Sequence, residues 1–148
     1  MLDRDLFEIA IRDLVVAKYF YGRISQGDSD YSYNCTAFYS QQALEKCIKS
    51  ISIGNDMGAT HDIEYLINKA KEMNVELFLS DYLINNAKII STWEEDALYE
   101  ILYEVDHEKA KEVFPYVEEY LNIISKSKFK YGDVYEHLKK TKNKKGNV

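Results

Sequence analysis

The sequence has few of the residues that interrupt helices or cross-link chains. It contains one proline, six glycines and two cysteines in 148 residues, so there are few positions at which a helix must end. Cys35 and Cys47 have no Cys-x-x-Cys partner, which argues against a zinc site or a redox pair and favours buried free thiols. We therefore expect an all-α domain without a disulfide.

Long hydrophobic runs are also absent. No segment approaches the ~20 consecutive apolar residues that a transmembrane helix requires. The first seven residues carry acids where a secretory signal needs a basic region followed by an apolar run. We therefore expect a cytoplasmic protein that does not span a membrane. With 46% hydrophobic and 30% charged residues, the chain is typical of a single folded domain.

The charge is divided unevenly along the chain. Residues 1–125 hold 11 Lys and Arg against 23 Asp and Glu, whereas residues 126–148 hold 8 against 2. The acidic part repels nucleic-acid phosphates at long range, which argues against nonspecific binding by the whole surface. The basic part could contact RNA phosphates or an acidic neighbour, but a solvated terminus that aids solubility is the favoured interpretation.

Apolar residues recur at three- and four-residue steps and predict the helices. The predicted segments are 3–24, 31–53, 60–72, 76–90, 93–105, 106–124 and a short 131–140. Thr60 and Asp106 are the expected N-caps, and Thr92 with Glu95 resembles a capping box that would start a new helix or bend the chain. Pro115 predicts a kink or break near residues 111–115. We assign 1–125 to a helical domain and 126–148 to a basic extension that is partly helical and then frayed.

Aromatic residues are unusually common, with thirteen tyrosines and one tryptophan. Five tyrosines cluster around the first predicted hairpin, where they could stack on bases or pack against the protein with their hydroxyls in water. Packing is the favoured interpretation for these residues and for Trp93. The cluster consists of Tyr19, Tyr21, Tyr31, Tyr33 and Tyr39.

Three segments resemble the HEPN domain family. They are the run Ala37-Phe-Tyr-Ser-Gln-Gln-Ala-Leu-Glu-Lys-Cys-Ile-Lys49, the preceding Asp13-Leu-Val-Val-Ala17 and the following His61-Asp-Ile-Glu-Tyr-Leu66. The resemblance covers residues 6–90. It implies an antiparallel up-and-down bundle of about five to six helices that commonly forms a two-fold dimer. It also implies frequent association with a minimal nucleotidyltransferase, as in toxin and antitoxin pairs.

Many members of this family are metal-independent ribonucleases that use an Arg followed, after four to six residues, by a His near the start of a late helix. The only arginines here, Arg4, Arg12 and Arg23, lie on the first predicted helix. His107 is the weak catalytic candidate, and acidic residues surround it in the sequence. The resemblance therefore favours a non-catalytic member.

The residues that carry the resemblance are also the candidate ligand-binding set: Gln41, Gln42, Glu45, Lys46, Lys49, His61 and Asp62. In a binding site, Lys46 or Lys49 would meet a phosphate, the glutamines would contact a base or ribose, and His61 would close the pocket. In a structural role, Lys46 would pair with Asp13, which needs a partner on its apolar stripe, and His61 with Asp62 would satisfy a helix start. Glu45 and Lys49 are spaced for a helical ion pair. The structural role is favoured.

Three functions remain open. The first is a non-catalytic, dimeric HEPN module that binds a nucleotidyltransferase partner, a nucleotide or RNA. The second is a HEPN ribonuclease that uses His107, or a site assembled across a dimer from Arg23, Lys49 and His61. The third is a structural assembly domain without a ligand. No cofactor is expected, and no metal site is expected because His61, His107 and His137 are far apart in the sequence and lack a second ligand nearby.

Overall fold

The computed structural model describes residues 2–27, 30–52, 60–98, 105–129 and 132–136, and the regular elements in these ranges are all helical. In chain order they are α1 (Arg4–Ile24), α2 (Asp30–Ile51), α3 (Ile63–Glu72), α4 (Asp81–Asn85), α5 (Ala87–Leu98), α6 (His107–Asn122) and the π-helix η1 (Ile123–Lys128). The predicted all-α class is confirmed. Among the described helices, none is long and apolar enough to cross a bilayer.

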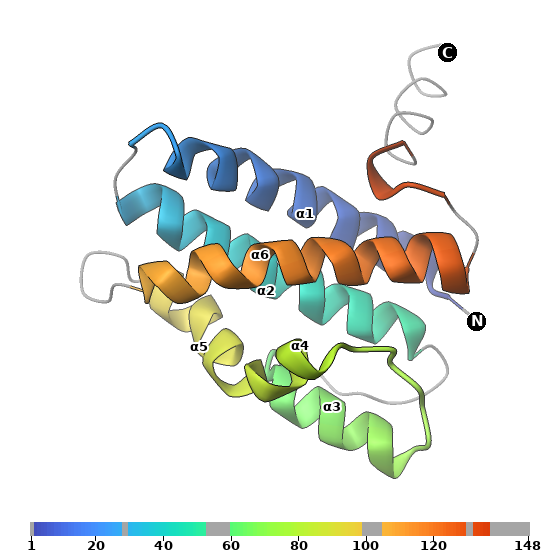
Figure 1. The fold of residues 1–148 in the computed structure, drawn as a ribbon. Helices are drawn as coiled ribbons and strands as arrows, with labels where there is room; N and C mark the ends of the chain where they lie inside the picture. Colours follow the sequence, from blue (N-terminus) through green and yellow to red (C-terminus); the bar gives the residue numbers. More distant parts are fainter. Residues whose placement is uncertain (1, 28–29, 53–59, 99–104, 130–131, 137–148) are drawn as a thin grey trace.

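The first two helices form an antiparallel hairpin (Figure 1). Asp3 caps α1, because its carboxylate accepts a hydrogen bond of 3.1 Å from the backbone N–H of Leu6. The backbone N–H of Asp3 also donates to the carbonyl of Ser50 at 2.8 Å, which fixes the start of α1 against the end of α2. The first predicted helix is thus confirmed to within a residue.

Helix α2 lies at the centre of the bundle, in contact with α1, α3, α5 and α6. Figure 1 shows α6 running along α1 and α2, with α3, α4 and α5 on the other side of α2. Trp93 from α5 is 1% exposed, so its predicted packing role is confirmed. Both cysteines are free; Cys47 is buried as predicted, and burial raises the pKa of its thiol, whereas Cys35 is partly exposed.

Helix α3 ends at Glu72, as predicted, in a Schellman turn. Asn74 takes a left-handed conformation with φ of +56°, which Asn tolerates better than most residues. The backbone N–H of Val75 then donates to the carbonyl of Ala70 at 2.8 Å, and that of Asn74 to Lys71 at 3.2 Å. This turn reverses the chain and directs the next residues back along α3.

The prediction of one helix over 76–90 is wrong. Residues 75–80 are not helical, and Phe78 has a φ of +62° that a helix does not accommodate. Ser80 instead caps α4 by accepting a hydrogen bond from the N–H of Leu83 at 3.2 Å, and Asn86 separates α4 from α5. The apolar periodicity of 76–90 was compatible with a helix, but the cap and the strained residue decide the structure.

The helical start or bend predicted at Thr92 and Glu95 is also wrong. Thr92 lies within α5, and its hydroxyl donates to the carbonyl of Ile89 at 2.6 Å instead of capping a new helix. Helix α5 ends at Leu98; residues 99–104 of the predicted 93–105 helix lie outside the described residues, and Val105 is not helical.

Helix α6 begins as predicted, since the Asp106 side chain accepts a hydrogen bond from the N–H of Lys109 at 3.0 Å. The helix continues without a break through Pro115, whose buried neighbours Phe114 and Val117 keep it docked on the core.

The chain then turns back onto the bundle after η1. The Ser125 hydroxyl donates to the Gly132 carbonyl at 2.6 Å, and Val134 is buried. Residues 134–136 are helical, and residues 137–140 of the predicted last helix lie outside the described ranges.

Candidate functional site

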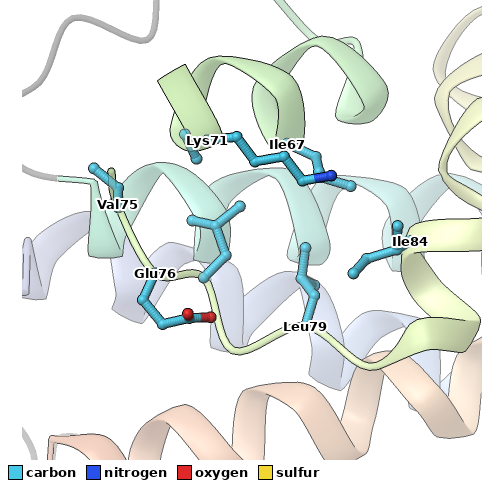
Figure 2. A pocket seen from close by; sticks show the side chains of 8 residues that line it. Ile67, Lys71, Val75, Glu76, Leu79 and Ile84 are labelled. Carbon is cyan, nitrogen blue, oxygen red and sulfur yellow. The ribbon is translucent and has the colours of Figure 1, made fainter. Parts of the chain in front are cut away.

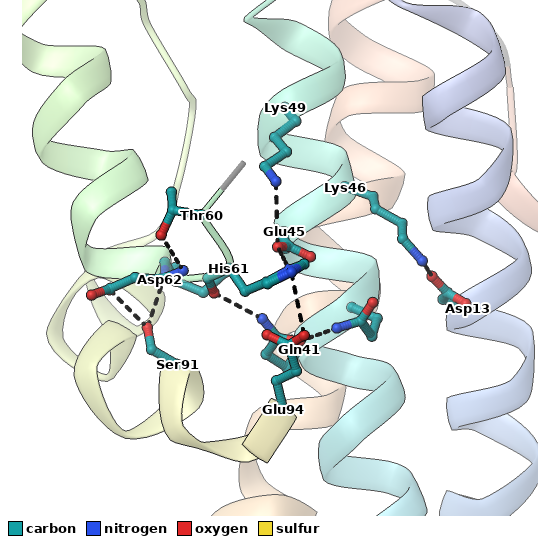
Figure 3. Close-up of polar contacts among 12 residues, drawn as sticks. Asp13, Gln41, Glu45, Lys46, Lys49, Thr60, His61, Asp62, Ser91 and Glu94 are labelled. Carbon is teal, nitrogen blue, oxygen red and sulfur yellow. Dashed lines mark hydrogen bonds and ion pairs between the residues drawn. The ribbon is translucent and has the colours of Figure 1, made fainter. Parts of the chain in front are cut away.

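The polar row on α2 faces the short segment that precedes α3. Gln41, Glu45 and Lys49 are spaced four residues apart, so they share one face of the helix (Figure 3). The Gln41 side-chain N–H donates to the carbonyl of His61 at 3.1 Å, and its side-chain oxygen accepts from Gln42 at 2.7 Å. Both amides are therefore engaged in contacts within the protein.

Glu45 is the centre of this row. Only 2% of its side chain is exposed, and a buried carboxylate needs charged or hydrogen-bonding partners. One oxygen, Oε1, lies 2.5 Å from His61 Nδ1 and 3.4 Å from Lys49 Nζ. The predicted pair between Glu45 and Lys49 is confirmed, and it is joined by an imidazole from another part of the chain.

The imidazole of His61 lies between two carboxylates. Its Nε2 atom is 3.5 Å from Oε1 of Glu94 on α5, on the side opposite Glu45. The side chain is 54% exposed, so solvent reaches the ring. His61 thus contacts carboxylates from both α2 and α5, and it faces acidic groups rather than an open cationic pocket.

Asp62 is the N-cap of α3. Its Oδ1 accepts from the N–H of Tyr65 at 3.1 Å and from the Ser91 hydroxyl at 3.2 Å, while Ser91 Oγ accepts from the N–H of Ile63 at 2.8 Å. The prediction that Thr60 caps this helix is wrong, because Thr60 instead accepts from the N–H of Asp62 at 3.1 Å. His61 and Asp62 therefore precede the first turn rather than forming it.

Lys46 lies apart from the other candidates, between α1 and α2. Its Nζ is 2.5 Å from Oδ2 of Asp13, which confirms the expected partner of that carboxylate. Burial raises the pKa of Asp13 above its ordinary value, and the hydrogen bond and charge of Lys46 act in the opposite direction. The seven candidates thus divide into a group of six near the start of α3 and one interhelical ion pair.

An open cleft of about 390 Å³ lies beside the group of six. We call it the α3–α5 cleft, and it is lined by His61, Asp62, Glu64, Lys88, Ser91, Thr92 and Glu94. Three carboxylates against one lysine disfavour a phosphate ligand. Sequence reasoning missed Ser91 and Glu94; the available signal was their spacing of three residues, which places them on one face of α5.

His107 is at a different site, at the start of α6. Its ring stacks on Tyr33 with centroids 4.0 Å apart, and its Nε2 is 3.4 Å from Oδ1 of Asp30. Both imidazoles in the described ranges therefore contact carboxylates. In the same ranges, no three His, Cys, Asp or Glu side chains gather as a metal-binding group would require.

The family comparison agrees with this architecture, because the model of the HEPN domain family matches residues 4–128. The chain belongs to the HEPN family. No curated protein and no solved structure matches it. The match spans the helices from α1 to η1, so it includes more of the chain than the three motifs that indicated the family.

This HEPN domain departs from the ribonuclease pattern of its family. Helix α6 starts at His107, but the residues five to seven positions before it are Glu100, Ile101 and Leu102, and none is an arginine.

The three residues proposed for an intersubunit site do not lie together within one protomer. Lys49 and His61 meet at Glu45 near the end of α2, whereas Arg23 is in the last turn of α1, at the opposite end of the antiparallel hairpin.

Proposed function

We propose that this HEPN domain is a non-catalytic association module that forms a homodimer and binds a protein partner, for which the family resemblance suggests a minimal nucleotidyltransferase. The observation that supports it is a continuous set of partly exposed rings on the α1–α2 hairpin. We call it the aromatic face, and it consists of Tyr19, Phe20, Tyr31, Phe38 and Tyr39.

Phe20 holds the aromatic face together. Its ring meets Tyr19 and Tyr31 edge-on, with centroids 5.1 and 5.6 Å away, and stacks on Tyr39 at 6.5 Å. Tyr19 and Tyr31 are nevertheless 60% and 53% exposed, so half or more of the surface of each residue is open to solvent. Aromatic rings that protrude from a packed cluster are typical of the centre of a protein interface.

The absence of charge permits a second copy of the chain to pack on this face. Residues 1–125 carry 23 acidic against 11 basic side chains, so two copies repel each other unless they meet through a neutral surface. All five residues of the aromatic face are uncharged. The exposed parts of the five rings can form the centre of an interface, for which the standard size is about 800 Å² per partner.

The polar candidates give less support to nucleotide or RNA binding. The ammonium groups of Lys46 and Lys49, which would meet a phosphate, are paired with Asp13 and Glu45. The α3–α5 cleft, which lies near Lys49 but apart from Lys46, is rich in carboxylates. Binding of a phosphate to either ammonium group would require its ion pair to be exchanged, at a cost in stability.

Analytical ultracentrifugation over a range of protein concentrations tests the dimer. We expect the wild-type protein to form a dimer and the double variant Tyr19→Asp, Tyr31→Asp to be a monomer with unchanged helix content. Tyr65→Asp, at a half-exposed tyrosine on α3, is the matched control and should remain a dimer. A wild-type monomer at every concentration, or equal dissociation of the control, would refute this role of the aromatic face.

Incubation with labelled RNA tests the absence of catalysis. We expect no cleavage by the wild-type protein or by His107→Ala. Cleavage by the wild-type protein that is lost in His107→Ala would instead establish the ribonuclease. Copurification from the native host tests the partner: recovery of a small nucleotidyltransferase supports the proposal, and recovery of RNA without any protein overturns the partner assignment.

A further inference from the structure

A second cavity lies between α3, the segment that follows it and α4. It has a volume of about 160 Å³, and its apolar walls are Ile67, Ala70, Val75, Leu77, Leu79 and Ile84. A cavity of about 150 Å³ with comparable walls is large enough for benzene. The pocket therefore suits one branched or aromatic group, whereas sites for larger ligands are typically about 300–1,000 Å³.

The wall formed by residues 75–79 is held in a strained conformation. Phe78 has a φ of +62°, an unfavourable region for a bulky side chain. Three contacts hold the segment: Tyr120 donates its hydroxyl to the Leu77 carbonyl at 2.6 Å, Glu76 Oε1 accepts from the N–H of Phe78 at 3.0 Å, and the Lys128 ammonium lies 4.4 Å from the Phe78 ring centroid. Strain of this kind persists only where the surroundings impose it.

Two opposite charges flank the apolar pocket. Figure 2 shows the Lys71 side chain extending across one side and the Glu76 carboxylate on the other. Within the described ranges Lys71 has no ion-pair partner, since the neighbouring pair on α3 joins Lys69 with Glu72. Glu76 Oε1 accepts the hydrogen bond from the Phe78 N–H. Lys71 and Glu76 are both exposed to solvent. A cation and an anion are thus available to one ligand in the pocket.

We propose that this pocket binds a free amino acid with a branched apolar side chain, such as leucine. The side chain enters the apolar cavity, the α-carboxylate pairs with the Lys71 ammonium, and the α-ammonium pairs with the Glu76 carboxylate. An apolar group that carries both charges matches all three features of the site, whereas a fatty acid or an alkylamine would leave one charge unpaired. This inference does not depend on the proposed dimer or its partner.

The test is a titration of the full-length protein followed by amide chemical shifts, with four probes. Leucine should bind most tightly and shift the amides of Ala70, Leu77 and Ile84. Isocaproate lacks the amine and isoamylamine lacks the carboxylate, so each should bind about two- to fivefold more weakly, the effect of one solvent-exposed ion pair. Glycine, which lacks the side chain, should produce no saturable shift.

Two variants assign the charges. Lys71→Met should remove the preference for leucine over isoamylamine, and Glu76→Gln, which keeps the acceptor for the Phe78 N–H, should remove the preference for leucine over isocaproate. Lys69→Met and Glu72→Gln make the same charge changes on α3 and should leave every affinity within about twofold of wild type. Equal binding of leucine, isocaproate and isoamylamine, no binding of leucine, or equal losses in the control variants would overturn the proposal.

Discussion

The ion pair between Asp13 and Lys46 allows a quantitative test of what holds α1 against α2. The two side chains are 15% and 25% exposed, so the pair is intermediate between a buried and a surface ion pair. Burial raises the pKa of Asp13, and the hydrogen bond and charge of Lys46 only partly offset this effect. The carboxylate is therefore costly to bury even with its partner, and it should be more costly without it.

The perturbation is Lys46→Met, which keeps the length of the side chain but removes the ammonium. Breaking a buried pair costs about 3–5 kcal/mol and an exposed one about 0.2–1 kcal/mol, so we expect the free energy of unfolding to fall by about 2 kcal/mol. Asp13→Asn should cost less than about 1 kcal/mol, because the Lys46 ammonium can still reach water. The double variant should cost no more than Asp13→Asn alone.

The destabilisation caused by Lys46→Met should depend on pH. Because the pKa of Asp13 is raised in the folded state, that state binds more protons than the unfolded state, and this residue destabilises the fold as pH rises through the folded pKa. Lys46→Met raises the pKa of Asp13 further. The resulting loss of unfolding free energy should therefore be complete at about pH 7.5 and smaller at about pH 4.5. Protonation of Asp13 removes the unpaired charge that the substitution creates.

Urea unfolding followed by circular dichroism, at both pH values and for all four proteins of the cycle, measures these differences. The reasoning is refuted if Lys46→Met costs the same at both pH values, or if the double variant loses the sum of the two single losses. Either result would mean that the two groups act independently and that burial of the carboxylate is not the dominant cost.

Substitutions at three further positions test local structure. Tyr120→Phe removes the donor to the Leu77 carbonyl and should lower the free energy of unfolding by about 1–3 kcal/mol in urea titrations; an unchanged value would contradict the hydrogen bond. Asn74→Gly should raise thermal stability slightly and Asn74→Val should lower it, because only glycine adopts a positive φ without cost; the reverse order would argue against the left-handed turn. Ser80→Ala should lower the free energy of unfolding by about 1 kcal/mol. The amide of Leu83, which donates its hydrogen bond to Ser80, should exchange faster, and unchanged exchange would refute this cap.

The sequence predicted the parts of the fold that depend on local periodicity. The bounds of α1 and the end of α3 follow from apolar spacing, and the start of α6 follows from a short-range signal, the cap at Asp106. The contact of Asp13 with Lys46 was also predictable, because a carboxylate on an apolar stripe needs a partner on the neighbouring helix. These inferences use only neighbours along one helix or across one hairpin.

The missed features depend on contacts between distant segments. The break at residues 75–80 contains Phe78 in a left-handed conformation, and the sequence gives no signal for this because phenylalanine rarely adopts it. Tyr120 from α6 stabilises the break through its hydrogen bond to the Leu77 carbonyl. The contact of His61 with Glu94 joins the start of α3 to α5, which are brought together only by packing. Sequence reasoning identified His61 but not the second carboxylate beside it.

The single indole of Trp93 has a practical consequence. Because it is enclosed within the core, emission excited selectively from tryptophan reports on the docking of α5, while the thirteen tyrosines report on the rest of the molecule. Coincident denaturation curves from the two signals and from helix content would indicate one cooperative unit. An earlier change in tryptophan emission would instead identify α5 as a segment that detaches before the hairpin unfolds.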